Sequence, residues 1–486
     1  MVAQEHLEIN IVGNIIMKNS NLLSRQVITY GLGHILARSI SFLLLPFYSH
    51  YFLPSEFGAM TLIYTFLGFM NVIVPLGLGS AMMRYYIPAD NEERKNVLSS
   101  AYAVTIISSI CFFVLSLFFY ETINDKIIFG PKLNTRIVWL VSLILVLDCL
   151  WSMHLTLLRA HNRAGFFVFS NIVNVLVVVI CNLVFVVRFG LGIEGVLISN
   201  LIASSISFII TIGIVIEKKF SFSYAKSRVI RKLFKFSIPM LATGVLSMVI
   251  ELSDRSIISY LMNDSSEVGL YSANYKIGMF MLLVVMGFNM AWQPYFLDKK
   301  NVGTLGVISE YSIYVGGLVW AVVSFIVPYI ITFKIAGFSI IDEVYWEGLN
   351  VIPTIALGYL FHGIYILSVP GMYITEKPHL LMYIRLGGAL LNIWLNFLFI
   401  PKYGSSGAAV ATMISFFAMA IFSYFINKSL LQEVRYNTLQ IILFMSFILI
   451  TFHSYSIIYS SPILIVLFFI TYIALVNHSS TSNSLK

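Results

Sequence analysis

Long apolar stretches recur along this chain from Val27 to Asn477, and they restrict its fold more than any other feature does. A run of about 18 or more apolar residues is typical of a membrane-spanning helix. Hydrophobic residues make up 59% of the sequence and charged residues only 11%. So few charges cannot cover the surface of a water-soluble protein. The sequence therefore predicts an all-α integral membrane protein.

The apolar stretches predict about 14 transmembrane helices. Their expected ranges are 27–50, 57–80, 97–119, 137–158, 166–187, 191–216, 236–263, 268–297, 304–333, 348–374, 379–400, 404–426, 438–457 and 461–477. Because this number is even, both chain termini should lie on the same side of the membrane.

Lys and Arg are distributed unequally between the two sides of this set of helices. With the N-terminus inside, the cytoplasmic segments hold 20 of the 30 Lys and Arg residues. The outer segments hold six, which are Lys126, Lys132, Arg136, Arg188, Lys334 and Lys402. Cytoplasmic loops of membrane proteins are enriched in Lys and Arg, so we expect both termini in the cytoplasm. The basic cytoplasmic segments then account for the net charge of +8, and we expect no nucleic acid partner.

The sequence contains a weak internal repeat. The segment SEFGAMTLIYTFLGFMNVIV, from Ser55, aligns with SEVGLYSANYKIGMFMLLVV, from Ser266. The segment NLVFVVRFGLGIEGVLIS, from Asn182, aligns with NFLFIPKYGSSGAAVAT, from Asn396. Further identical pairs are Glu56 and Glu267, Gly58 and Gly269, Tyr64 and Tyr275, Phe69 and Phe280, Met70 and Met281, Phe185 and Phe399, and Gly190 and Gly404.

The repeat pairs the first six predicted helices with the next six, so both copies enter the membrane in the same direction. We therefore expect two parallel-repeat six-helix lobes followed by two C-terminal helices. The expected segments are a cytoplasmic N-terminal segment (1–26), an N-lobe (27–216), a basic cytoplasmic linker (217–235), a C-lobe (236–427), two extra spans (428–477) and a cytoplasmic tail (478–486). Two such lobes around a central cavity form the architecture of a transporter.

Seven of the charged residues inside the predicted helices are candidate site residues. The cations are Arg38, Arg255, Lys276 and Arg385, and the acids are Asp148, Glu251 and Asp254. An Arg, Lys or Asp at the centre of a transmembrane helix costs roughly 2.5–3.5 kcal/mol on insertion scales. These side chains should therefore face the interior of the helix bundle or a wet cavity.

Two interpretations of these charges remain open. Glu251, Asp254 and Arg255 lie on one side of a helix, where they form either a static ion-pair cluster or a pairing that substrate or a coupling ion rearranges. Arg38, Lys276 and Arg385 have no acid nearby in sequence. These three cations are suited to bind a phosphate group of a substrate. The alternative is that Asp148 and the Glu251 cluster neutralise them within the protein.

Three histidines, His34, His154 and His362, each lie on an apolar span. Histidine titrates near neutral pH and can relay protons. A lone histidine on an apolar helix is nevertheless more often a hydrogen-bonded packing residue. We therefore expect packing roles for all three.

Motifs for catalysis, metals and cofactors are absent or lack the right context. GLGIEG, from Gly190, matches a dinucleotide-binding pattern but joins two spans, so it predicts a turn. The sequence holds no G-x-x-x-x-G-K-[ST] and no H-E-x-x-H motif. Cys111, Cys149 and Cys181 lie in apolar runs at spacings that fit neither disulfides nor a metal site. We expect no enzyme, no catalytic residues, no metal and no cofactor beyond a coupling H+ or Na+.

Two segments of the second copy, together with the DR of the seventh span, resemble a known family. SEVGLYSANYKIGMFMLLVVMGFNMAWQPYF and LNIWLNFLFIPKYGSSGAAVATMISF are similar to the polysaccharide-biosynthesis flippases of bacterial O-antigen and capsule pathways. That family belongs to the multidrug/oligosaccharidyl-lipid/polysaccharide exporter superfamily. Arg255 stands in the matching DR and Lys276 in the matching YK, whereas Arg38 and Arg385 match no motif.

The resemblance implies a flippase of the bacterial cytoplasmic (inner) membrane. Such a protein moves an undecaprenyl-diphosphate-linked oligosaccharide to the periplasmic leaflet by alternating access, for lipopolysaccharide or capsule synthesis. Its partners would be this lipid-linked oligosaccharide and membrane lipids, and other polysaccharide-assembly proteins are further candidate partners. The alternatives are a cation-coupled multidrug antiporter, a peptidoglycan-precursor flippase, a membrane glycosyl polymerase or ligase, and a structural scaffold.

Overall fold

A computed structural model of the chain describes residue 42 and residues 44–119, 134–297, 303–334 and 337–431. These residues form helices and turns and contain no β-strand. Ten helices in this part of the chain are long and apolar enough to cross a membrane. The predicted all-α membrane fold is therefore confirmed. The number of about 14 spans stays a prediction, because the last two predicted spans and most of the first lie outside the described residues.

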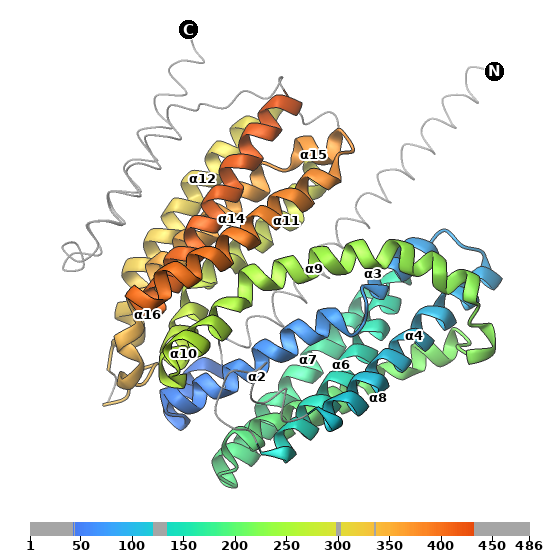
Figure 1. The fold of residues 1–486 in the computed structure, drawn as a ribbon, viewed down its shortest axis with the longest axis horizontal. Helices are drawn as coiled ribbons and strands as arrows, with labels where there is room; N and C mark the ends of the chain where they lie inside the picture. Colours follow the sequence, from blue (N-terminus) through green and yellow to red (C-terminus); the bar gives the residue numbers. More distant parts are fainter. Residues whose placement is uncertain (1–41, 43, 120–133, 298–302, 335–336, 432–486) are drawn as a thin grey trace, which may run out of the picture.

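The helices form two lobes (Figure 1). The N-lobe contains α2 (Pro54–Ile73), α3 (Leu78–Tyr86), α4 (Asn91–Phe118), α6 (Thr135–Ala160), α7 (Ala164–Asn182), which continues as the π-helix η2 (Leu183–Arg188), and α8 (Gly192–Glu217). The C-lobe contains α10 (Ser265–Gly278), α11 (Phe280–Leu297), α12 (Leu305–Ala321), η5 (Val322–Ile326), α13 (Val327–Thr332), η6 (Glu343–Gly348), α14 (Val351–Leu367), α15 (Pro370–Ile374) and α16 (Pro378–Leu430). The 3-10 turn η3 (Phe222–Tyr224) precedes α9 (Ser227–Met262), which runs from one lobe to the other.

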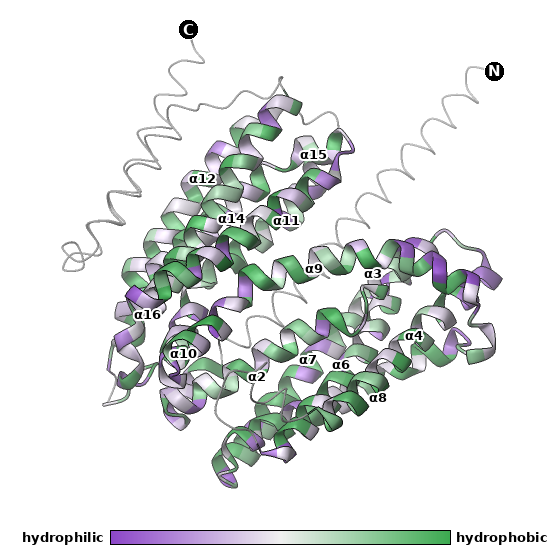
Figure 2. Ribbon diagram, viewed as in Figure 1, coloured by the Kyte–Doolittle hydropathy of each residue, from purple (hydrophilic) through white to green (hydrophobic). Residues whose placement is uncertain are grey.

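Apolar residues cover most of each helix, as Figure 2 shows. Large apolar side chains are exposed on the outer faces, including Phe118, Ile209 and Trp394. Exposed apolar surface of this extent suits contact with lipid rather than with water. Hydrophilic residues gather at the beginning of α9 and at the neighbouring ends of α3 and α4 (Figure 2).

Polar residues at the helix starts set several boundaries. The Asp90 carboxylate accepts hydrogen bonds from the backbone N–H groups of Glu92 and Glu93 at 3.0 and 2.8 Å. Asp264 accepts one from Ser266 at 2.7 Å at the start of α10. A capping side chain of this kind stabilises a helix by about 1 kcal/mol.

The long helix α16 is a hairpin of two helices. Gly404 interrupts it with φ 56° and ψ −138°, a left-handed conformation that favours glycine. Asn392 and Thr412 on its two arms are joined by a hydrogen bond of 3.3 Å, so the arms run antiparallel. Gly190, the repeat partner of Gly404, also has a positive φ of 65°. Both turns therefore contain a glycine with positive φ.

The two lobes touch through repeat-related glycines on α2 and α10. A Cβ atom on Gly58 would lie 1.8 Å from the carbonyl oxygen of Ser265, and one on Gly269 would lie 1.8 Å from that of Pro54. Only glycine permits such a close approach of two backbones. We call this end of the molecule the closed end. Here Tyr345 of η6 also donates a hydrogen bond to the carbonyl of Phe52 at 2.8 Å.

Helix α9 bridges the lobes. Its first part packs on α3 and α4, and its later part packs on α2, α10 and α16. Near its start, Lys232 forms an ion pair with Glu93 at 3.4 Å, and the Arg84 guanidinium lies 4.7 Å from the centre of the Phe236 ring. The helix begins at Ser227, so the second part of the predicted linker 217–235 is helical.

Candidate functional site

A cavity of about 440 Å³ lies between the lobes. Its walls come from α2, α7 and α8 on one side and from α9, α10 and α14 on the other. Its polar lining consists of Tyr48, Thr61, Tyr64, Thr65, Asn174, Asn200, Glu251, Arg255, Tyr275, Lys276 and Tyr359. This volume falls within the roughly 300–1,000 Å³ typical of small-molecule sites. We call it the interlobe cavity.

The internal repeat places equivalent positions on its two walls. Tyr64 on α2 and its partner Tyr275 on α10 both line the cavity, as do Thr65 and the aligned Lys276. The repeat symmetry is therefore broken by charge, because an ammonium group in the C-lobe stands where the N-lobe has a hydroxyl.

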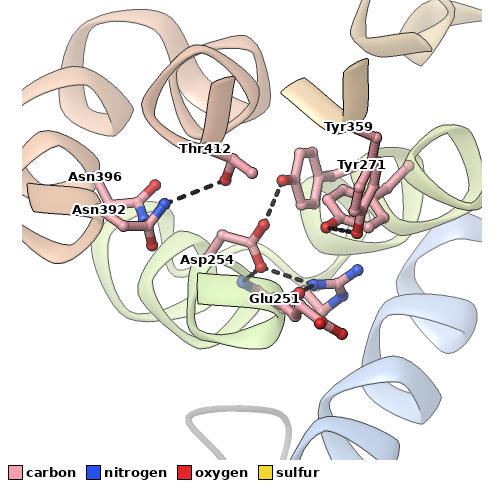
Figure 3. A network of polar contacts seen from close by, with 9 residues as sticks. Glu251, Asp254, Tyr271, Tyr359, Asn392, Asn396 and Thr412 are labelled. Atoms are coloured by element: carbon pink, nitrogen blue, oxygen red, sulfur yellow. Dashed lines mark hydrogen bonds and ion pairs between the residues drawn. The ribbon is translucent and has the colours of Figure 1, made fainter. Parts of the chain in front are cut away.

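Arg255 is held in a buried ion pair with the preceding residue. Asp254 is fully buried and the Arg255 side chain is 7% exposed. The Asp254 Oδ1 atom accepts hydrogen bonds from Nη1 and from the backbone N–H of Arg255, both at 2.8 Å. Its Oδ2 atom accepts one from the Tyr271 hydroxyl. Both carboxylate oxygens are thus engaged (Figure 3), so Asp254 positions Arg255 and offsets its charge.

Aromatic rings complete the surroundings of the guanidinium. The Arg255 Cζ atom lies 4.2 Å from the ring centre of Tyr275 and 5.8 Å from that of Tyr271, distances that allow cation–π attraction. The hydroxyls of Tyr275 and Tyr359 lie 2.7 Å apart. Tyr271, Tyr275 and Tyr359 were not predicted as site residues. The four-residue spacing of the first two, which places them on one helix face, was the available signal.

Lys276 lines the interlobe cavity one residue after Tyr275. Its Nζ atom lies 5.0 Å from the centre of the Phe57 ring on α2. Within the described ranges no carboxylate forms an ion pair with Lys276. A charged side chain inside a bundle of membrane-spanning helices is costly unless water or an anion solvates it. Lys276 therefore brings to the cavity a positive charge that no carboxylate of the described residues contacts directly.

Glu251 and Arg385 connect this site with a second cavity. Glu251 lines the interlobe cavity and also a cavity of about 260 Å³ inside the C-lobe. Arg385 lines only the second one, which we call the C-lobe cavity. Its Nε atom donates a hydrogen bond to the Tyr365 hydroxyl at 3.3 Å. The structure thus brings Arg255, Lys276 and Glu251 together and places Arg385 apart from them.

The remaining predicted site residues lie elsewhere. Asp148 on α6 accepts a hydrogen bond from Ser204 on α8 at 2.6 Å and lines neither of the two cavities. Arg38 lies outside the described residues. On α16, the buried amide of Asn396 donates a hydrogen bond to Asn392 at 3.0 Å, and Figure 3 shows both residues. Among the described residues no group of three or more His, Cys, Asp and Glu side chains is placed to hold a metal ion.

Two histidines show contrasting surroundings. His154 is fully buried, and its ring nitrogens lie 2.6 Å from the Tyr102 hydroxyl and 2.9 Å from the Thr211 hydroxyl. Its predicted packing role is confirmed. His362 lines the C-lobe cavity with its ring 5.8 Å from that of Tyr365. His34 lies outside the described residues.

His161 lies in the turn between α6 and α7. Its Nε2 atom lies 2.8 Å from the hydroxyl of Tyr86. Partial burial, followed by the charges of Lys218, Arg163 and Arg94, lowers the pKa of His161. The imidazole should therefore be neutral at pH 7.

Solved structures share this fold. The lipid II flippase MurJ in an inward closed conformation superposes with a TM-score of 0.75 at 19% identity, covering 93% of this chain and 99% of that one. An inward-facing multidrug resistance MATE family transporter of the MOP superfamily gives a TM-score of 0.67 at 13% identity, covering 81% and 94%. At these identities the similarity establishes the fold.

Sequence comparison establishes the family. An uncharacterized membrane protein of Methanocaldococcus jannaschii is 23% identical over 452 residues, which are 82% of this chain and 83% of that protein. An uncharacterized membrane protein of Haemophilus influenzae is 23% identical over 281 residues, covering 57% and 65%. The MatE family matches residues 239–398, and the family described as polysaccharide biosynthesis protein matches residues 23–299. This multi-pass membrane protein therefore belongs to the polysaccharide biosynthesis protein family.

Proposed function

We propose that this protein is a flippase for an undecaprenyl-diphosphate-linked oligosaccharide used in surface polysaccharide synthesis. The observation that supports this most is the interlobe cavity, which presents Arg255 and Lys276 between two lobes. The family and the MurJ-like fold agree with a lipid-linked substrate.

The diphosphate is the part of the substrate that these cations suit. Asp254 offsets the charge of Arg255, but the guanidinium still has N–H groups beyond the Nη1 contact to Asp254. Lys276 adds a positive charge with no carboxylate in ion-pair contact within the described ranges. Hydrogen bonds between ionised partners are about twice as strong as neutral ones. Arg38 remains a predicted contributor to the same binding.

Alternating access requires the lobes to close one end of the cavity at a time. The glycine contact between α2 and α10 closes one end, and the lobes diverge away from it (Figure 1). The basic residues Arg84 and Lys232 lie near the other end, on α3 and α9. By the positive-inside rule we assign that end to the cytoplasm, with both termini on the same side of the inner membrane. The conformation described here then faces the cytoplasm.

A coupling ion would act through an acid. Of the three predicted acids, Glu251 lines the interlobe cavity, whereas Asp254 and Asp148 do not. We therefore place exchange of H+ or Na+ at Glu251, with Asp148 as the second candidate.

Transport in proteoliposomes tests the proposed function. The purified chain is reconstituted with a fluorescent undecaprenyl-diphosphate oligosaccharide, and a membrane-impermeant enzyme that modifies the sugar reports how much has crossed. We expect translocation above that of protein-free liposomes, and a large loss with Lys276→Gln but none with Lys402→Gln, which changes an exposed residue of α16. Translocation equal to that of empty liposomes would refute the proposal.

The MurJ-like fold supports a second candidate, a peptidoglycan-precursor flippase. Both substrates carry the diphosphate, so the interlobe cavity suits either. The same assay with lipid II as cargo separates them, because the preferred cargo should inhibit translocation of the other. A multidrug antiporter would instead expel cationic dyes from the vesicles and leave both lipids in place.

A further inference from the structure

The C-lobe cavity is a polar chamber within an apolar lobe. It is bounded by α9, α11, α14, α15 and the arms of α16. Polar lining residues reach it from several of these helices, including Ser247, Glu251, Asn289, Gln293 and Arg385. Gln293 and Tyr373 are exposed, so the chamber opens near the end of α11 and at α15. In Figure 1, α15 lies at the end of the C-lobe opposite α10.

Two amide side chains in this chamber have no protein partner in the described ranges. Asn289 and Gln293 are four residues apart on α11, so they lie one helical turn apart on the same face. No hydrogen bond of either side chain occurs within the part of the chain that the structure describes. An amide offers both donors and acceptors, and leaving it unpaired in an apolar region is costly. These amides therefore bind water or the hydroxyl groups of a ligand.

Arg385 brings a positive charge into the same chamber. Its hydrogen bond to Tyr365 uses only Nε. Among the described residues no carboxylate forms an ion pair with it. The two terminal nitrogens of a guanidinium present N–H groups in a planar fork that matches a carboxylate. An acidic group on a ligand would find this fork available.

Aromatic rings and size narrow the class of ligand. Phe296, Tyr365, Tyr373 and Phe416 line the chamber beside the polar groups. The C–H face of a sugar ring packs well on an aromatic ring, whose face carries partial negative charge. A volume of about 260 Å³ lies just below the roughly 300 Å³ at which sites for drug-sized ligands begin. One or two sugar rings fit this description better than a whole oligosaccharide or a lipid tail.

We propose that the C-lobe cavity is a carbohydrate subsite in which Arg385 recognises the carboxylate of an acidic sugar. The proposal rests on the proposed flippase function and deepens it. The diphosphate occupies the interlobe cavity, and a sugar near it enters the C-lobe cavity past Glu251, which lines both. Asn289 and Gln293 bind the sugar hydroxyls, and Arg385 determines specificity.

Binding of small sugars to the full-length chain in nanodiscs tests this directly. Methyl β-D-glucuronide and methyl β-D-glucoside share one ring and differ by the carboxylate. Their affinities are measured by saturation-transfer difference NMR, with inorganic pyrophosphate as a third probe. We expect the glucuronide to bind about tenfold more tightly than the glucoside, as expected for one hydrogen bond to a charged group. Arg385→Gln should abolish this preference, Arg385→Lys should retain part of it, and Lys402→Gln should leave it unchanged.

A second variant distinguishes recognition from structural damage. Replacing both Asn289 and Gln293 with Ala should weaken the two glycosides alike and keep their ratio. Equal binding of the two glycosides to the unmodified chain, or an unchanged preference in folded Arg385→Gln, would overturn the proposal. Displacement of the glucuronide by pyrophosphate in a manner that requires Arg385 would also overturn it, because the chamber would then be a phosphate site.

The outcome is separable from that of the flippase proposal. If the subsite assignment fails, lipid-linked cargo should still cross the membrane in a manner that depends on Lys276. If the flippase proposal fails, sugar selectivity at Arg385 can persist in the absence of any translocation.

Discussion

Replacing Gly58 with alanine should shift the protein away from the conformation described here. The new Cβ atom would lie 1.8 Å from the carbonyl oxygen of Ser265 and 2.9 Å from the backbone nitrogen of Gly269. Both neighbours are backbone atoms, so no side-chain rotation relieves the clash. To restore an ordinary contact, α2 and α10 must separate by more than about 1 Å.

The energetic effect follows from this overlap. Inserting a methyl group into a well-packed contact costs about 1–3 kcal/mol. The α2–α10 contact closes one end of the cavity, and alternating access requires it to open. The substitution should therefore penalise the closed-end conformer selectively and change the ratio of the two conformers by roughly 5- to 150-fold.

Distances across the closed end report this ratio. Spin labels on cysteines at Leu53 and Phe338, which are 62% and 74% exposed, give a distance distribution by double electron–electron resonance. The exposed native Cys111 is first replaced by serine. We expect Gly58→Ala to add a population at longer distance. The matched control is Gly387→Ala on α16, where a Cβ atom meets nothing within 4 Å.

Two results would refute the reasoning. The first is a Gly58→Ala protein that is folded and gives the same distance distribution as the unmodified chain. The second is an equal shift caused by Gly387→Ala, which would show that the change does not depend on the α2–α10 contact.

Three further predictions follow from individual contacts. Asp254→Asn leaves the buried Arg255 charge unpaired and should destabilise the protein by about 3–5 kcal/mol, measured as a lower thermal unfolding midpoint. If the unpaired charge is the cause, the double variant Asp254→Asn/Arg255→Gln should lose less stability than Asp254→Asn alone. The pKa of His161 is lowered in the folded state, so protonation of this residue favours the unfolded chain. The contribution of neutral His161 to folding stability should therefore be complete above pH 6.5, the ordinary pKa of histidine being about 6.5, and should decline as the pH falls below that value. His161→Gln should remove this part of the pH dependence of unfolding, and an unchanged profile would contradict it. Glu251→Gln should make translocation insensitive to imposed H+ and Na+ gradients, and a retained response would place coupling at another acid.

The repeat allowed much of the fold to be predicted from the sequence. Gly58 aligns with Gly269, and the two residues meet at the lobe contact. Gly190 aligns with Gly404, and both have positive φ. The length of the apolar stretches and the repeated turn residues are local features, so they can be recognised in a single sequence. The pairing of the two glycines across the contact is a tertiary feature, which alignment alone could not reveal.

The site was harder to predict because its contacts are between helices. The spacing of Glu251, Asp254 and Arg255 indicated a shared face, but the ion pair forms between adjacent residues. Tyr271 reaches Asp254 from another helix, and no local pattern marks that contact. Arg385 was grouped with the other cations on charge alone. Packing of α11, α14 and α16 places it in a separate cavity.

Photocrosslinking from the cavity wall shows whether the lipid-linked substrate passes between the lobes. Benzoylphenylalanine is introduced at Tyr64, which lines the interlobe cavity, and in a separate variant at Phe169, which is exposed on α7. In membranes that contain radiolabelled undecaprenyl-diphosphate oligosaccharide, the Tyr64 variant should capture the substrate, and unlabelled substrate should compete. Capture at Phe169 with none at Tyr64 would contradict passage of the substrate between the lobes.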